Sequence, residues 1–303
     1  MLTAVDGRKL GATWYEPAQP AHAVAVIGPA GGVPQGYYRA FAQWLAGRGY
    51  AVLTLDYRGY GASRLEPLRR DPARMTDWAV LDIGAALATA TARAKKNAQT
   101  LPLLLVGHSF GGNSAAFAPG VCGVDAILMV AAGTGEPRLL PWPQRALVAL
   151  FFRILLPLVL PLFGHLPGWV LGPGAQPLPA GVARQWLRWG LRKGWAFADP
   201  EMQPLSAAAA VTAPVHLWSF DDDHLHASRR AVDALAVHYS QAAVQRHHLR
   251  PADVGLRRLG HFGAFRRQAG PKLWPLLLQP LEVALPALRP PPAADSPGYS
   301  AGP

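Results

Sequence analysis

A serine, several carboxylates and a histidine follow one another along this chain in an order that suits nucleophilic catalysis. Ser109 is the centre of a Gly-His-Ser-Phe-Gly motif at 107–111, which follows the apolar run 103–106 and precedes small residues at 113–117. This context predicts a strand, a sharp turn and a helix: a nucleophile elbow, whose glycines make room for a strained backbone. Because a serine hydroxyl is a weak nucleophile at neutral pH, it needs an imidazole to take its proton and a carboxylate to orient that imidazole.

The candidate acids are three consecutive aspartates at 221–223, which follow the strand-like run 214–219. In folds built around such an elbow, the acid comes after a late strand and the histidine comes last. A later loop, 259–265, places glycines on both sides of His261, so this histidine could approach the serine closely. We predict that His261 is the general base and that one of the three aspartates orients it.

The segment 221–226 could also form a metal site, because His224 and His226 lie two positions apart beside the carboxylates. The spacing indicates no third histidine ligand, and the nucleophilic site accounts for the same residues. We therefore expect no metal and no organic cofactor. Of the other histidines, His108 lies inside the elbow and the pair at 247–248 at strand positions, and isolated histidines are more often structural than catalytic.

The oxyanion that forms when a serine attacks a carbonyl needs two hydrogen-bond donors. One is expected to be the backbone N–H of Phe110, the residue after the nucleophile. The second should follow the first central strand, where the chain reads Gly-Pro-Ala-Gly-Gly at 28–32. Pro29 has no N–H to donate, so we predict Gly31 as the second donor, with Ala30 as the alternative.

The elements that must position these residues alternate between short apolar strands and helical patterns. The strand candidates are 23–27, 50–55, 103–106, 126–130 and 214–218, preceded by an antiparallel strand at 13–16. Helical spacing occupies 37–48 and 76–96 between them. Helical crossovers between apolar strands predict an α/β fold with a mostly parallel, doubly wound sheet.

The alternation stops after residue 135 and resumes near 211, which leaves an apolar stretch too long for a simple crossover. We interpret this stretch as an inserted helical cap. The predicted organisation is a first core part at 1–132, the cap at 133–205, a second core part at 206–288 and a disordered Pro-rich tail at 289–303. Four aromatic residues of the cap either line the substrate pocket or pack the cap onto the core: Phe151, Phe152, Trp186 and Trp189.

Composition limits the class of protein. The chain has 303 residues, half of them hydrophobic, and can bury one large core. A single cysteine, Cys122, excludes an internal disulfide, and residues 1–15 lack the apolar core of a secretory signal, so we expect a cytoplasmic protein. The net charge of +11 comes from dispersed arginines, so no nucleic-acid partner is expected, and the oligomeric state is left open.

The cap contains an apolar run at 146–163 that is interrupted only by Arg153 and is close to the minimum length of a membrane span. Pro157 and Pro161 should break a helix in its second half, and Arg153 would lie near the bilayer centre. The two prolines and the arginine therefore argue against a transmembrane helix. A peripheral membrane contact through the apolar cap stays open.

Two further motifs extend the pattern: Asp-Tyr-Arg-Gly-Tyr-Gly-Ala-Ser at 56–63 and Gly-His-Phe at 260–262. With the elbow they resemble the α/β-hydrolase superfamily, whose fold is a mostly parallel sheet with an inserted cap. In related enzymes a glycine commonly ends the strand and the acid follows three residues later. Phe220 takes the place of that glycine here, so the resemblance implies Asp223 as the acid, with Asp222 as the alternative.

A narrower similarity, through 29–38, 172–174 and 260–263, is to a bacterial group of uncharacterised predicted hydrolases. The core motifs also resemble those of monoglyceride-lipase-like and serine-aminopeptidase-like proteins. The prediction is a serine hydrolase that cleaves a carboxylic ester of a small apolar or acyl substrate through an acyl-enzyme. A thioesterase or aminopeptidase with the same triad is the first alternative, and a non-catalytic protein that binds a hydrophobic ligand or a membrane surface is the second.

Overall fold

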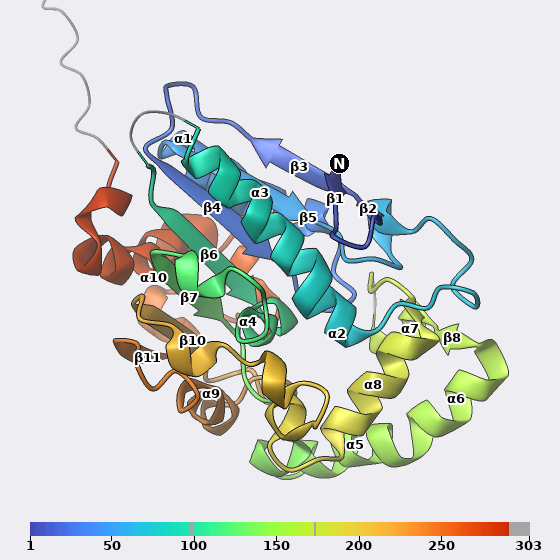
Figure 1. Cartoon of the computed structure of the whole chain (residues 1–303). Helices are drawn as coiled ribbons and strands as arrows, with labels where there is room; N and C mark the ends of the chain where they lie inside the picture. Colours follow the sequence, from blue (N-terminus) through green and yellow to red (C-terminus); the bar gives the residue numbers. More distant parts are fainter. Residues whose placement is uncertain (97–99, 173, 291–303) are drawn as a thin grey trace, which may run out of the picture.

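The computed structural model describes residues 1–96, 100–172 and 174–290 (Figure 1). Its strands are β1 (Leu2–Thr3), β2 (Lys9–Leu10), β3 (Ala12–Tyr15), β4 (Ala23–Gly28), β5 (Tyr50–Leu55), β6 (Leu103–His108), β7 (Ala126–Val130), β8 (His165–Leu166), β9 (Leu178–Pro179), β10 (Val215–Phe220) and β11 (Val244–Leu249). Seven of them form the central sheet in the order β11-β10-β7-β6-β4-β5-β3, and all are parallel except β3. This confirms the predicted parallel sheet and its leading antiparallel strand.

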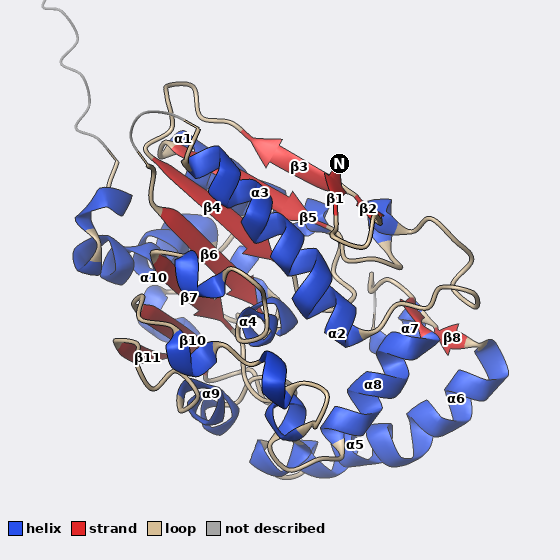
Figure 2. Ribbon diagram, in the orientation of Figure 1, coloured by secondary structure: helices blue, strands red, loops and turns tan. Residues whose placement is uncertain are grey.

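The helices are α1 (Arg39–Gly47), α2 (Met75–Asp77), α3 (Gly84–Ala94), α4 (Phe110–Ala115), α5 (Gln144–Leu150), α6 (Leu156–Phe163), α7 (Gly168–Leu171), α8 (Ala180–Gly190), α9 (Arg229–Ala236) and α10 (Gly270–Ala284). A π-helical segment, Trp78–Ile83, joins α2 to α3, so the predicted crossover at 76–96 is one long helix. Helices α1 and α10 cover one face of the sheet, while α3 lies on the other (Figures 1 and 2). The predicted doubly wound arrangement is therefore confirmed.

The sheet interior explains why these runs form strands. Every residue of β4, β5, β6, β7 and β10 is buried, as expected for parallel strands covered on both faces. The strand β6 lies between β4 and β7, with Gly107 opposite both Gly28 and Met129. The loops that follow β4, β6 and β10 consequently leave the same edge of the sheet, where ligands bind in open α/β folds.

Helices α5 to α8 and the two-stranded β8–β9 sheet lie between β7 and β10 in the chain, beside the central sheet (Figure 1). We call residues 137–198 of this region the helical insert. The expected break at Pro157 and Pro161 is wrong, because the helix continues from Gln144 to Phe163. A π-helical segment, Phe151–Leu155, ends two residues before Pro157 and loosens the hydrogen-bond ladder where the proline lacks an N–H. The division into core and cap remains a prediction, and residues 291–303 of the predicted tail lie outside the described residues.

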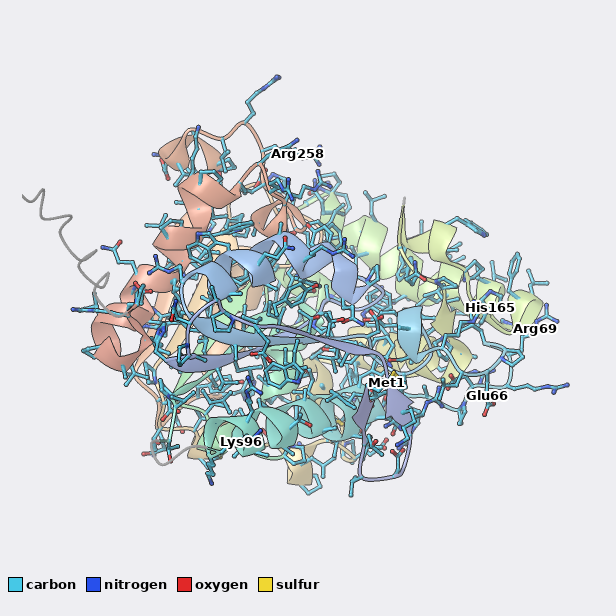
Figure 3. All side chains as sticks on the ribbon, turned by 90° about the horizontal axis from the view of Figure 1, so that it is seen from above. Met1, Glu66, Arg69, Lys96, His165 and Arg258 are labelled. Atoms are coloured by element: carbon cyan, nitrogen blue, oxygen red, sulfur yellow. The ribbon has the colours of Figure 1, made fainter. Side chains whose placement is uncertain are left out.

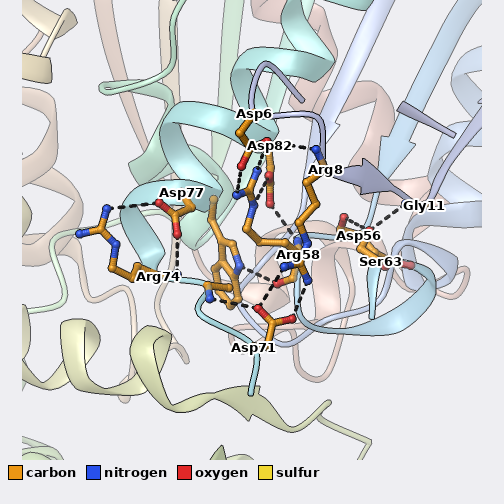
Figure 4. Close-up of polar contacts among 12 residues, drawn as sticks. Asp6, Arg8, Gly11, Asp56, Arg58, Ser63, Asp71, Arg74, Asp77 and Asp82 are labelled. Carbon is orange, nitrogen blue, oxygen red and sulfur yellow. Dashed lines mark hydrogen bonds and ion pairs between the residues drawn. The ribbon is translucent and has the colours of Figure 1, made fainter. Parts of the chain in front are cut away.

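A buried polar network anchors the segment 56–63 to the core (Figure 4). Arg58 Nε donates to Asp82 Oδ1 at 2.7 Å, and Arg58 Nη1 also lies 2.7 Å from Asp6 Oδ2. Burial raises the pKa of Asp82, while the pairing with Arg58 acts in the opposite direction. Asp56 accepts the backbone N–H of Gln35 at 2.7 Å, which ties this segment to the loop after β4. The motif at 56–63 thus has a structural role in the fold.

Candidate active site

The elbow has the strained geometry that its glycines predict. Ser109 adopts φ 51° and ψ −115°, between the end of β6 and the start of α4. A Cβ on Gly111 would lie 2.0 Å from the carbonyl oxygen of Gly28, and one on Gly107 would lie 2.4 Å from Gly112 Cα. Glycine is therefore required on both sides of the serine, where β4, β6 and α4 meet.

The structure brings Ser109, His261 and Asp223 together from three separate loops. His261 Nε2 lies 2.8 Å from Ser109 Oγ, and His261 Nδ1 lies 2.7 Å from Asp223 Oδ2. With Nδ1–H donating to the carboxylate, Nε2 of a neutral imidazole is the nitrogen free to accept the serine proton. Burial opposes ionisation of Asp223, yet its electrostatic interaction and hydrogen bond with His261 outweigh burial and lower the pKa of Asp223.

The alternative acid, Asp222, contacts the histidine loop but, in the part of the chain that the structure describes, makes no hydrogen bond to His261. Its two carboxylate oxygens accept the backbone N–H groups of Leu259 at 2.9 Å and Gly260 at 2.8 Å. Asp222 therefore holds the loop, while Asp223 holds the ring. The third aspartate, Asp221, is exposed and lies 3.4 Å from His248 Nε2.

The histidine loop is fixed from its other side by two consecutive tyrosines and by His108. Tyr37 Oη donates to the carbonyl oxygen of Phe262. His108 Nε2 lies 2.8 Å from the carbonyl oxygen of His261, and His108 Nδ1 lies 2.7 Å from Tyr38 Oη. A carbonyl only accepts, so Nε2 carries the proton and Nδ1 accepts from the Tyr38 hydroxyl. Sequence reasoning missed these positioning residues, which come from distant parts of the chain.

The same chain of hydrogen bonds bears on the oxyanion donors. Tyr38 Oη accepts the backbone N–H of Ala30 at 2.8 Å, so this amide already has a partner. Gly31 and Phe110 both line the cavity beside Ser109. Burial lowers the pKa of His108 to about 3, and the neighbouring His261 acts in the same direction, so His108 stays neutral and keeps this arrangement. The geometry therefore favours Gly31 over Ala30 as the second donor.

Ser109 and His261 open into a cavity of about 390 Å³, within the size range of small-molecule sites. Phe151, Phe152 and Trp186 line it, and no aspartate or glutamate does so among the described residues. The predicted place of Trp189 in the pocket is wrong and its packing alternative holds: it is buried, its Nε1 donates to Asp199 and its ring packs on Trp195. Trp186 and Trp189 lie on the same face of α8. Trp186 is at the part of this face that lines the cavity, whereas Trp189 is at the part that is buried inside the insert.

A few polar atoms interrupt the apolar lining. Asn113 Oδ1 and Trp195 Nε1 are buried at the cavity and have no hydrogen-bond partner among the described residues. His226 also lines the cavity and stacks on His261, with 4.3 Å between ring centroids. Asp223, His226 and His261 could together contact a metal ion, since their ligand atoms lie within 4.8 Å of one another. Two of these residues already form the Asp–His pair that faces Ser109.

The chain belongs to the alpha/beta hydrolase family, because the model of that family matches residues 25–294. This confirms the resemblance drawn from the motifs, and it makes a hydrolase the class of enzyme that the fold and family support. A soluble variant of monoglyceride lipase from Saccharomyces cerevisiae, in complex with a substrate analog, is similar with a TM-score of 0.65 at 14% identity, over 93% of this chain and 95% of that chain.

Two further solved structures share the fold. Est1E from Butyrivibrio proteoclasticus, with ferulic acid bound, has a TM-score of 0.58 at 18% identity, over 95% of this chain and 99% of that one. The monoacylglycerol lipase of Paleococcus ferrophilus has a TM-score of 0.55 at 15% identity, over 90% and 98%. No curated protein matches the sequence. At these identities the likeness concerns the fold alone.

Proposed function

We propose that this protein is a serine hydrolase that cleaves carboxylic esters through an acyl-enzyme. The observation that carries the proposal is the contact of 2.8 Å between His261 Nε2 and Ser109 Oγ, with Asp223 behind the imidazole and an apolar cavity in front of the serine. Ser109 attacks the ester carbonyl while His261 takes its proton and passes it to the departing alcohol. Water then attacks the acyl-enzyme with His261 as base, and the carboxylic acid leaves.

The cavity lining supports an uncharged, largely apolar substrate. Its side chains carry no carboxylate, and none of its described residues is lysine or arginine. An aminopeptidase needs a carboxylate for the substrate amine, and the acids near the insert are engaged elsewhere: Glu136 pairs with Arg138, Asp199 with Arg188 and Glu201 with Arg74. These pairs favour an ester over a peptide with a free amino terminus.

The first experiment tests the nucleophile with a covalent probe and a substrate series. A fluorophosphonate should label wild-type protein, with the added mass mapping to Ser109, and p-nitrophenyl esters from acetyl to palmitoyl should report kcat/KM for each acyl length. Ser109→Ala should abolish the label and lower kcat by about 10⁴-fold or more. The matched control is Ser114→Ala on the same helix, because the Ser114 hydroxyl donates to the Gly111 carbonyl and Ser114 is not among the described residues that line the cavity.

Labelling at another residue, or equal turnover by wild type and Ser109→Ala, would contradict the proposal. Turnover of thioesters but not of oxygen esters would keep the nucleophile and replace the substrate class. A wild-type protein that binds hydrophobic ligands but neither reacts with the probe nor turns over any ester would favour the non-catalytic alternative.

A further inference from the structure

The outer face of the helix Gln144–Phe163 is apolar and uncovered. Five of its residues are spaced three or four apart and are between 51% and 75% exposed: Leu147, Leu150, Ile154, Leu158 and Leu162. We call them the exposed stripe. Residues with this spacing lie along one side of a helix. Monomeric proteins rarely expose contiguous apolar patches of this extent, so the stripe marks a surface that meets an apolar partner.

Exposed tryptophans lie near both ends of the stripe. Trp142 comes shortly before α5 and is 77% exposed, and Trp169 of α7 is 68% exposed and packs beside Phe163 at 6.1 Å between ring centroids. Tryptophan combines an apolar ring with an N–H donor and is enriched where hydrocarbon meets water. An apolar stripe with such ends fits the boundary of a lipid layer, where each ring would have an apolar and a hydrated side.

The charges around the stripe are almost all positive. Between 137 and 198 the chain has six arginines and one lysine but no aspartate or glutamate. Arg145 and Arg153 are exposed on the stripe helix itself and form no ion pair among the described residues. At the far end of α6, Arg69 Nε donates to the carbonyl of Phe163 at 2.9 Å, near His165 (Figure 3). The exposed Glu66 of that neighbouring loop is outnumbered by its arginines.

The same helix forms both the stripe and part of the cavity wall. Val148, Phe151 and Phe152 line the cavity, and Leu147, at the edge of the stripe, also reaches it. Phe151 packs on Trp186 of α8 at 5.5 Å between ring centroids. By length and composition the helix could cross a membrane, but crossing would remove this wall from the site. A helix that lies in the interface keeps its inner contacts while its outer face enters the lipid.

We infer that the exposed stripe docks the protein onto an anionic lipid bilayer, so that an apolar ester passes from the lipid to Ser109 along the insert. The supply of substrate rests on the proposed function, whereas the docking itself does not. Exposed leucines and isoleucine enter the acyl boundary, and Arg145 and Arg153 face the anionic headgroups.

The test measures binding of the full chain to vesicles by flotation, with phosphatidylcholine alone or mixed with phosphatidylglycerol. Wild type should bind the anionic vesicles more tightly, and less tightly as salt rises. Ile154→Gln with Leu158→Gln should lower the affinity at least about tenfold, because two large apolar side chains no longer enter the lipid. Arg145→Glu with Arg153→Glu should weaken binding to anionic vesicles and leave binding to neutral ones nearly unchanged.

The matched control replaces Val237 and Val283 with Gln, since these two valines are 68% and 63% exposed but lie at the end of α9 and on α10, respectively. It should bind vesicles as wild type does. Turnover of a short, soluble p-nitrophenyl ester should be the same in all of these variants. A wild type that binds vesicles but hydrolyses no ester would leave the docking in place and remove the proposed function.

Four results would overturn the docking. The first is a wild type that floats with neither kind of vesicle, and the second is a valine control that loses as much affinity as the stripe variant. Retention in vesicles after an alkaline carbonate wash would indicate a spanning helix instead. A wild-type dimer in sedimentation that the Ile154 and Leu158 substitutions convert to a monomer would show that a second copy of the chain covers the stripe.

Discussion

The sheet core and the helical insert differ in where their ionisable side chains lie. The core buries the carboxylates of Asp71, Asp82 and Asp223, and each has a cationic or imidazole partner within 2.7 Å. The insert has no carboxylate between 137 and 198 and leaves its arginines in solvent or on its edges. In the core, a charge fixes the position of a loop or a ring. In the insert, the absence of carboxylates keeps the cavity wall uncharged and the outer face attractive to anions.

The largest effect that separates the two regions is expected at Asp223. In Asp223→Asn the amide N–H would favour the imidazole tautomer with the proton on Nε2, which cannot accept a proton from Ser109. We expect kcat for p-nitrophenyl esters to fall by about 10⁴-fold. On the insert, Arg184→Gln removes an exposed charge and should leave kcat unchanged. Steady-state kinetics on both variants would measure this contrast.

Asp222→Asn is the internal control, because it changes the same functional group one position away. It weakens the hydrogen bonds that Asp222 accepts from the backbone N–H groups of Leu259 and Gly260. Because this change acts only through the position of the histidine loop, kcat should fall by less than about 100-fold. If Asp222→Asn proved as damaging as Asp223→Asn, the two aspartates would not have the separate roles that the hydrogen bonds indicate.

The next effect concerns stability. Asp82→Ala leaves the buried Arg58 guanidinium without its fully buried partner, and the free energy of unfolding should fall by about 3–5 kcal/mol. Arg145→Ala on the insert removes a charge with no ion pair among the described residues and should change it by less than about 0.5 kcal/mol. Urea denaturation would measure both. Equal losses in the two variants would mean that the core network contributes no more than a surface charge.

The fold could be predicted from the sequence because its signals are local. Apolar runs with helical segments between them specify a parallel sheet, and the glycines at 107 and 111 surround a serine that is close to them in the chain. The boundary errors were small: β4, β6 and β10 each extend one or two residues beyond the predicted runs. The π-helical segment before Pro157 was not predictable, because proline alone indicates a break and the compensating backbone change leaves no mark on composition.

The site could be predicted only in part, for a related physical reason. Two neighbouring aspartates have the same chemistry, so residue type leaves both open, and it was the spacing from Phe220 in the family resemblance that implied Asp223. The folded loop adds the separate role of Asp222, which accepts two backbone amides while Asp223 meets the imidazole. Tyr38 and His108 lie 70 residues apart, and nothing in either local pattern indicates that they share a proton. The spacing of Trp186 and Trp189 specified that both lie on one face of a helix. It did not indicate that the first lines the cavity while the second packs inside the insert.

The smallest predicted effect is a pH dependence of the free energy of unfolding. It is expected for a histidine of the core and not for a histidine of the insert. Burial lowers the pKa of His108 to about 3 from 6.5. Between these values the unfolded chain binds a proton that the folded chain excludes, so this group's stabilising contribution is complete above pH 6.5 and declines as pH falls. His108→Gln keeps a donor and an acceptor, and should reduce the loss of unfolding free energy between pH 7 and pH 5 by about 2 kcal/mol.

Urea denaturation at both pH values measures that difference, and His165→Gln on the insert is the control. His165 is only partly buried, with one ring nitrogen 2.9 Å from the carbonyl of Phe163, so its replacement should leave the difference between the two pH values as in wild type. An unchanged pH dependence in His108→Gln would mean that His108 is protonated in the folded protein. His108 Nδ1 would then carry a proton, so the Tyr38 hydroxyl could not donate to it and would accept a hydrogen bond from it instead.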